Sequence, residues 1–230
     1  MTSQNSLKAV NGNILKAEVS IRAGSVMLNG TLALPRDTNS IVLFVHGSGS
    51  SRHSARNIYV ASVLQSAGIA TLLFDLLTED EEAIDNHTAH LRFDIGLLAE
   101  RLIHVTHWVQ ANPSTEQLKI AYFGASTGAA AALVAAAVLG NQISAIVSRG
   151  GRPDLAGDAL TEVKSPTLLI VGGFDNDVIA LNEQALRLLP CEKELKIVHA
   201  ASHLFEEPGK LEEVAKISSN WLVHKLQIKE

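Results

Sequence analysis

The stretch from Lys119 to Leu139, KIAYFGASTGAAAALVAAAVL, contains the features that decide the fold. Its first five residues, 119–123, are mostly apolar and predict a buried strand. Residues 127–139 are rich in alanine and leucine and predict a helix, which Gly140 is well suited to end. Gly124-Ala-Ser-Thr-Gly128 lies between them. The stretch therefore predicts a strand, a tight turn and a helix in direct succession.

The same alternation of strand and helix continues on both sides. Strands are expected at 15–22, 26–34, 41–45, 70–74, 119–123, 143–148, 167–171 and 195–198, and helices at 54–67, 93–110, 127–139, 178–188 and 211–226. Asn29-Gly30 indicates a bend or bulge in the second strand. This order predicts an α/β fold: a mostly parallel sheet of about eight strands with helices on both faces. Functional sites in such sheets lie beyond the carboxyl ends of the strands.

The chain of 230 residues contains no linker or repeat, so a single domain over 1–230 is expected, with residues 1–14 as a flexible leader. The first ten residues are polar and do not resemble a secretory signal. The longest apolar run, 129–139, is too short to span a bilayer. A soluble cytoplasmic protein without a membrane partner is the expectation.

Charge and cysteine content narrow the possible partners, cross-links and metal sites of the protein. The formal net charge of −5 weighs against a nucleic-acid partner. Cys191 is the single cysteine, which excludes an internal disulfide and a cysteine-based zinc site and fits a reducing compartment. His104 and His107 are three residues apart on a predicted helix but lack a suitably placed acid. No metal and no cofactor are expected.

Ser126 is the candidate nucleophile. It is the central residue of a G-x-S-x-G pattern, which is weak alone but stronger between a strand and a helix. A sharp turn there projects the serine hydroxyl from the sheet edge, and glycines allow neighbouring backbones to pass closely. The helix N-terminus favours negative charge developing beside it.

A serine hydroxyl needs a base, and that base needs an orienting acid. Asp175 follows the strand at 167–171 and is the favoured acid. Asp177 is its competitor, but is explained as the N-cap of the next helix. His203 lies on the loop after the last strand and is the favoured base, whereas His199 continues the strand and is interpreted as a packed or hydrogen-bonded residue.

An oxyanion hole is also required. The backbone N–H of Thr127 is one expected donor, because it directly follows the nucleophile. The other is the backbone N–H of Ser48, on the loop after the strand at 41–45. His46, on the same loop, is expected to brace it.

Two loops depart from a plain scaffold. Residues 76–90 carry five acids in seven positions, at 79–82 and 85. A solvated surface loop is the favoured interpretation, and a flap over the site is the alternative. Residues 150–164 have room for roughly one helix, which excludes a large cap domain there.

Together these residues resemble the α/β-hydrolase superfamily, and within it the dienelactone-hydrolase-like group. The resemblance runs from about residue 15 to the final helix and rests on HGSGSS (46–51), GASTG (124–128), GGFD (172–175) and SHLFEEPG (202–209). It implies Ser126, Asp175 and His203 as the triad and Ser48 and Thr127 as oxyanion donors. Dienelactone hydrolase proper uses a cysteine nucleophile, so the serine here puts dienelactone as the substrate in doubt. SRGGRPD (148–154) looks like a motif of small relatives, some fused to phosphoribosyltransferase domains.

Two arginines bear on the substrate. Arg52 follows the oxyanion loop and Arg149 ends a strand, so both could approach a carboxylate or phosphate. Alternatively they brace loops by pairing with acids such as Asp94 or Asp154. The expected substrate is a small-molecule ester or lactone, which the first interpretation makes anionic.

The sequence therefore predicts a serine hydrolase that cleaves small carboxylic esters or lactones through an acyl-enzyme. Acyl transfer or deacylation with the same triad is one alternative. A non-catalytic binding protein that keeps the fold is another.

Overall fold

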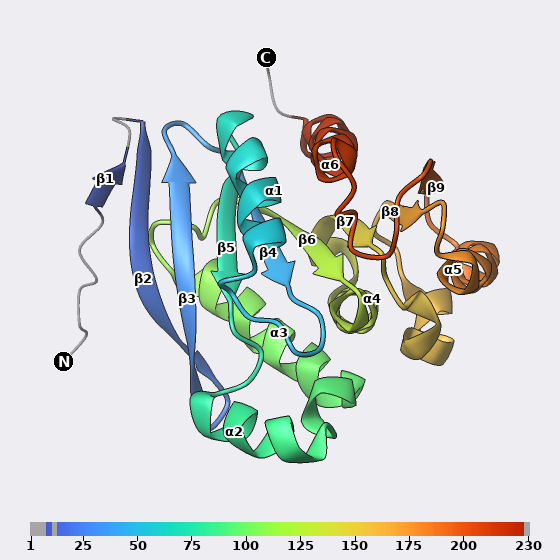
Figure 1. The fold of residues 1–230 in the computed structure, drawn as a ribbon. Coiled ribbons are helices and arrows are strands. Elements are labelled where there is room, and N and C mark those ends of the chain that lie inside the picture. Colours follow the sequence, from blue (N-terminus) through green and yellow to red (C-terminus); the bar gives the residue numbers. More distant parts are fainter. Residues whose placement is uncertain (1–7, 11–12, 228–230) are drawn as a thin grey trace.

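A computed structural model describes residues 8–10 and 13–227, as one sheet covered by helices (Figure 1). The strands are β1 (Lys8–Val10), β2 (Ile14–Ala23), β3 (Val26–Pro35), β4 (Ser40–Val45), β5 (Ala70–Phe74), β6 (Lys119–Ala125), β7 (Ile143–Arg149), β8 (Thr167–Gly172) and β9 (Lys193–Val198). The α-helices are α1 (Ala55–Ser66), α2 (Glu79–Thr88), α3 (Ile95–Ala111), α4 (Thr127–Leu139), α5 (Asn176–Leu188) and α6 (Lys210–Leu226). Short 3-10 segments are η1 (Leu91–Phe93), η2 (Gly140–Gln142) and η3 (Pro153–Glu162).

The sheet has the order β1-β2-β3-β5-β4-β6-β7-β8-β9. All pairings from β5 to β9 are parallel, whereas β1, β2 and β3 add an antiparallel edge. Without the three-residue β1, eight strands remain. The predicted α/β fold with a mostly parallel sheet is confirmed.

Helices cover both faces of the sheet because the central strands are apolar on both sides. In β4, Ile41 and Leu43 belong to the core cluster beneath α3 and α4, while Val42 and Phe44 belong to the cluster beneath α1 and α6. Figure 1 shows α1 and α6 on one face and α3 and α4 on the other. This two-sided burial explains why the parallel strands read as continuous apolar runs. Among the described residues, no helix has both the length and the apolar character that crossing a bilayer demands.

Two predictions near the N-terminus are wrong. Residues 8–10 of the expected leader form β1, which pairs with the start of β2; residues 1–7, 11 and 12 lie outside the described part. Asn29-Gly30 produces no bulge, since β2 and β3 pair without a break from Ile14–Pro35 to Ala23–Val26. Gly30 is instead a packing position: an added Cβ would lie 3.2 Å from side-chain atoms of both Leu72 and Val19.

The acidic segment is also not an irregular loop. Residues 79–88 form α2, which begins with a capping box: Thr78 Oγ1 accepts from the Glu81 N–H, and Glu81 Oε2 accepts from the Thr78 N–H. Four acids in the first turn complement the positive end of the helix dipole. Figure 1 places α2 beyond the ends of the parallel strands, on the side where sites occur in such folds.

Candidate active site

Ser126 occupies a strained turn between β6 and α4. Its backbone has φ 51° and ψ −122°, a conformation that costs a non-glycine residue about 1–3 kcal/mol. The surroundings hold it there: the Ser126 N–H donates to the Arg149 carbonyl (3.2 Å), and the Ser126 carbonyl accepts from Ala129 (3.1 Å) and Arg152 (3.1 Å). Backbone strain of this kind persists only where the surrounding structure holds the residue in place.

The two glycines of the pentapeptide are required by close packing. A Cβ on Gly128 would lie 2.3 Å from the Val45 carbonyl oxygen and 2.4 Å from that of His46. A Cβ on Gly124 would lie 2.5 Å from the Ala129 Cα. The turn therefore fits only without side chains at both positions.

His203 and Asp175 form a hydrogen-bonded pair. His203 Nδ1 lies 2.6 Å from Asp175 Oδ2. An ionised carboxylate only accepts, so Nδ1 carries the proton and Nε2 is left as the free basic nitrogen. The Asp175 side chain is 17% exposed and that of His203 is 38% exposed, so the imidazole is open to solvent while the carboxylate is sheltered.

Asp175, and not Asp177, occupies the N-cap position of α5, which corrects the predicted role of Asp177. The Asp175 side chain makes no capping hydrogen bond, because its carboxylate is directed to His203 instead. Asp177 lies in the first turn of the helix. His199, expected to be packed, is exposed just after the end of β9.

Short contacts fix the loop that carries His203. A Cβ on Gly172 would lie 2.4 Å from the Ser202 carbonyl oxygen, so the loop runs directly over the end of β8. The Ser202 N–H donates to both carboxylate oxygens of Glu207, at 3.0 Å each. This backbone hydrogen bond lowers the pKa of Glu207. Sequence reasoning did not find Glu207, whose partner is a backbone group.

The loop of His203 and the turn of Ser126 meet at the end of β7. The Arg149 carbonyl accepts the N–H of Ser126. The next residue, Gly150, packs against His203: a Cβ added to Gly150 would lie 3.5 Å from His203 Cε1. Ser126, Asp175 and His203 thus follow the carboxyl ends of β6, β8 and β9, which lie on the same side of the sheet as the end of β7.

The predicted oxyanion residues are also neighbours. Gly47 packs on Ser126, since an added Cβ would lie 3.0 Å from Ser126 Cβ. The next residue, Ser48, donates its backbone N–H to the Thr127 Oγ1 at 2.9 Å. Ser48 and Thr127 are therefore brought together, but through the hydroxyl of Thr127.

His46 braces this loop in a defined tautomer. Its Nε2 accepts from the Leu76 N–H (3.0 Å), so Nδ1 carries the proton and donates to the Gly47 carbonyl (3.0 Å). Burial lowers the pKa of His46, although nearby Asp75 and Glu82 oppose the shift. The ring stays neutral and fixes the peptide that precedes Ser48.

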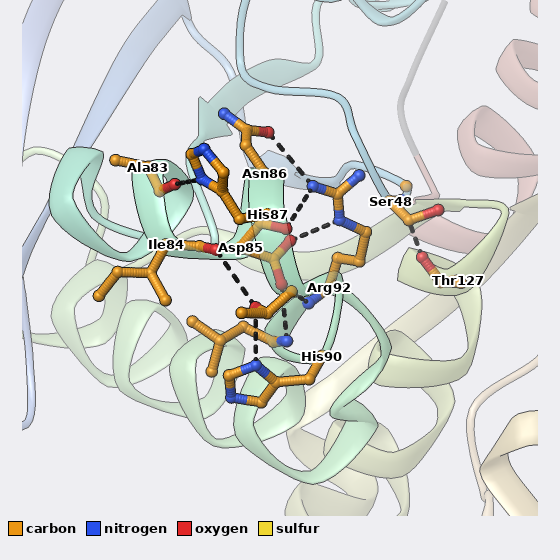
Figure 2. A network of polar contacts seen from close by, with 12 residues as sticks. Ser48, Ala83, Ile84, Asp85, Asn86, His87, His90, Arg92 and Thr127 are labelled. Carbon is orange, nitrogen blue, oxygen red and sulfur yellow. Dashed lines mark hydrogen bonds and ion pairs between the residues drawn. The ribbon is translucent and has the colours of Figure 1, made fainter.

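Helix α2 forms a wall beside the oxyanion loop. A cavity between them is lined by Ser48, Gly49, Leu76, Asp85 and Arg92, among others. Figure 2 shows Asp85 and Arg92 joined by several contacts close to the Ser48–Thr127 hydrogen bond. Desolvation opposes ionisation of Asp85, but hydrogen bonds from Arg92 outweigh it and lower the pKa of this carboxyl. The sequence pointed to the acids but not to Arg92 as their partner.

The two candidate substrate-binding arginines differ sharply. Arg52 pairs with Asp75 through its side chain and through its backbone N–H (2.8 Å), and Glu18 lies 3.8 Å from its Nε. These acids are not the ones expected from the sequence, because they come from distant strands. Asp154, one of the expected partners, pairs instead with Arg152 (2.7 Å).

Arg149 is buried without an acidic partner. Its Nη2 lies 3.5 Å from Asn57 Oδ1, and Nε and Nη1 have no partner within the described residues. Burial, together with the neighbouring positive charge of Arg56, lowers the pKa of Arg149 to about 10. Arg56 itself lies 3.3 Å from Glu206.

Within residues 8–10 and 13–227, no group of three or more histidine, cysteine or acidic side chains is placed to hold a metal ion. His104 lies 3.7 Å from Glu100, one turn earlier on α3. Cys191 is a free thiol whose pKa is raised by partial burial.

No protein-family model matches the chain. Two curated relatives from Mycobacterium tuberculosis strains CDC 1551 and H37Rv, each named "Putative phosphoribosyl transferase", are 56% identical over 209 residues. The match covers 91% of this chain and 46% of each relative, so the chain spans less than half their length.

Solved structures are similar over nearly the whole chain. A crystal structure of dienelactone hydrolase from Anabaena variabilis is 59% identical, has a TM-score of 0.91, and is matched over 93% of this chain and 99% of that one. The dienelactone hydrolase-like phosphotriesterase P91 from metagenomic libraries shares the fold, with a TM-score of 0.74 at 17% identity over 93% of this chain and 99% of that one. The fold and the extensive identity to the Anabaena protein show that this chain belongs to the dienelactone hydrolase-like family of α/β-hydrolases.

Proposed function

We propose that this protein is a serine hydrolase that cleaves small carboxylic esters or lactones, with Ser126 as nucleophile, His203 as base and Asp175 as the orienting acid. The observation that carries the proposal is the 2.6 Å Asp175–His203 hydrogen bond beside a serine in strained backbone conformation. Perturbed geometry of this kind clusters at active sites.

In the proposed reaction, the Ser126 hydroxyl oxygen attacks the carbonyl carbon while its proton passes to His203 Nε2. The tetrahedral oxyanion collapses, and His203 returns the proton to the leaving alkoxide as the ester bond breaks. Water then attacks the acyl-enzyme by the same route and releases the acid. In a lactone both products remain in one molecule.

Hydrolysis is favoured over acyl transfer because the base is exposed. The imidazole of His203 is open to solvent, and η3 is too short to form a large cap over the triad. Water therefore reaches the acyl-enzyme. A non-catalytic binding role is less favoured, since all three triad residues are present and two of them are hydrogen-bonded.

We further propose that the substrate carries an anionic group, which Arg149 binds. A buried guanidinium with two free nitrogen atoms is costly unless a counter-charge pairs with it. A substrate carboxylate or phosphate would supply that charge one strand away from Ser126. Arg52 is less suited to this role, because Asp75 already binds its guanidinium.

The name of the mycobacterial relatives has a simple explanation in this proposal. These relatives are more than twice as long as the matched region, since 46% of their length corresponds to this chain. The phosphoribosyl transferase activity would belong to their remaining part.

Turnover of p-nitrophenyl acetate tests the proposed hydrolase. Wild type should hydrolyse the ester, and Ser126→Ala should lose activity by about 10⁶-fold. Ser62→Ala, which removes an exposed hydroxyl on α1, is the matched control and should leave the rate unchanged. Equal rates for wild type and Ser126→Ala would refute the proposal.

The anionic substrate is tested by comparing a mono-p-nitrophenyl succinate with the neutral acetate. Arg149→Met should lower kcat/KM for the anionic ester at least about tenfold relative to the neutral one, as expected for one lost charge-assisted hydrogen bond. Arg52→Met should leave this ratio unchanged. Identical losses on both esters in Arg149→Met would show that the residue is structural.

A further inference from the structure

The hydroxyl of Thr127 contacts Ser48, the residue whose backbone N–H the sequence predicts as an oxyanion donor. Thr127 is the first residue of α4 and is only 3% exposed. Its Oγ1 accepts the N–H of Ser48 at 2.9 Å, which Figure 2 shows as the contact nearest the start of α4. The predicted donor Ser48 is therefore engaged by a side chain that also belongs to the site.

A hydroxyl group has one proton to donate and two lone pairs. In Thr127 one lone pair is used by Ser48, and the proton has no acceptor within the part of the chain that the structure describes. A buried donor without a partner is unfavourable unless something supplies an acceptor during function. The backbone N–H of Thr127 is likewise free of helical partners, because the first N–H groups of a helix have none.

The Ser48–Thr127 hydrogen bond lies close to Ser126. Gly47 packs so tightly on Ser126 that an added Cβ would lie 3.0 Å from Ser126 Cβ, and Ser48 and Thr127 directly follow these two residues in the chain. Resting on the proposed hydrolase function, we infer that the Thr127 hydroxyl donates a hydrogen bond to the oxyanion, while the Ser48 N–H donates to that hydroxyl from behind.

In this arrangement the oxyanion receives two hydrogen bonds from one residue, the backbone N–H and the side-chain O–H of Thr127. Ser48 polarises the hydroxyl, and such chains strengthen each member. No proton is transferred: Thr127 keeps its hydrogen, and only the charge on the substrate oxygen changes. Serine at position 127 could act in the same way, whereas valine or alanine could not.

Substitutions at Thr127 distinguish a hydroxyl that donates to the oxyanion from one that only occupies the N–H of Ser48. If the hydroxyl is a donor, Thr127→Val should lower kcat for p-nitrophenyl acetate by about 10²-fold with little change in KM, the effect of losing one oxyanion donor. Thr127→Ser should retain most of the rate. If the hydroxyl merely blocks Ser48, Thr127→Val would free that N–H, and kcat would stay the same or rise.

Further measurements keep the test decisive. Thermal unfolding checks each variant, and Thr127→Ala replaces Thr127→Val if valine prevents folding. Thr167→Val removes an equally buried hydroxyl at the opposite edge of the sheet, where it donates to the Ser165 carbonyl (2.9 Å), and should not change kcat. A phenylboronic acid that forms a tetrahedral adduct should bind Thr127→Val more weakly by a factor similar to the loss in kcat.

Three results would overturn the inference: an unchanged or raised kcat in Thr127→Val or Thr127→Ala, an equal loss in Thr127→Ser, or unaltered boronate affinity. Failure of the proposed function is distinct from these. It would appear as a wild-type rate no greater than that of Ser126→Ala.

Discussion

Individual residues of the site are held by contacts that come from far along the chain. Ser126 is strained but has its backbone N–H and carbonyl satisfied by neighbouring strands and loops. His203 depends on a carboxylate 28 residues earlier. The site therefore depends on the finished sheet and not on any local segment.

Replacing Asp175 should affect the tautomer of the base. In Asp175→Asn, the amide can donate to His203 Nδ1, which would move the proton to Nε2 and remove the free basic nitrogen. We expect kcat to fall by about 10⁴-fold in ester hydrolysis. Asp177→Asn is the matched control, and a larger loss there than in Asp175→Asn would reverse the assignment of the acid.

The pairing of Asp175 with His203 at the strand ends could be predicted from the sequence, because each residue follows an apolar strand in a characteristic order. The contacts of Thr127 and Glu207 could not, since each of them pairs with a backbone N–H. The Arg92–Asp85 pair could not either, because it depends on the turn of the chain after α2. Arg52 illustrates the same limit: its loop position was apparent, but pairing with Asp75 depends on how β5 ends.

At the scale of elements, the buried parallel strands were predictable, whereas β1 and α2 were not. Continuous apolar runs identify strands that are buried on both faces, as in β4 to β8. Helix α2 has no apolar stripe, and only Asp85 is buried in it. Its visible signal was the Thr78-Glu-Asp-Glu81 capping box, which acidic composition obscured.

Helix α2 should open more often when its N-terminal capping hydrogen bond is removed. Thr78→Ala removes the N-cap and should cost about 1 kcal/mol. Hydrogen exchange is expected to accelerate in 79–92, while the central strands stay protected. Thr38→Ala, which removes a turn hydroxyl near the opposite edge of the sheet, controls for a general loss of stability. Uniform acceleration in both variants would contradict a local role for the cap.

The elbow between β6 and α4 should tolerate no Cβ at Gly128. Gly128→Ala would force an atom to within 2.3 Å of the Val45 carbonyl oxygen, so the protein should fail to fold or melt far below wild type. Gly96→Ala, in α3, meets its nearest atom at 3.4 Å and should be tolerated. Thermal unfolding followed by circular dichroism compares the melting temperatures of the two variants. A wild-type melting temperature for Gly128→Ala would contradict the close packing of Gly128 on the Val45 carbonyl.

For the whole molecule, stability should decrease as the pH falls below about 6.5. Burial lowers the pKa of His46 in the folded state, whereas the unfolded chain keeps the ordinary value of 6.5. Above that pH both states are neutral. Below it His46 binds a proton in the unfolded state but not in the folded state. The free energy of unfolding therefore falls by up to about 1.4 kcal/mol per pH unit.

The carboxylates add a second phase at lower pH. Hydrogen bonds from Thr78 and Arg101 outweigh desolvation and lower the pKa of Glu81, and the Ser202 N–H lowers that of Glu207. Their stabilisation is present above the ordinary pKa of 4.5 and is lost as the pH falls through the folded values. Urea unfolding between about pH 2 and pH 8 measures both phases. His46→Gln should flatten the first phase, and an unchanged slope would assign it to another group.

The most direct test of the central claim is mass spectrometry of the intact protein after treatment with a fluorophosphonate. One adduct should form per chain, peptide mapping should place it on Ser126, and His203→Ala should slow its formation because the serine loses its base. Absence of an adduct, or its location on any residue other than Ser126, would contradict the proposed nucleophile.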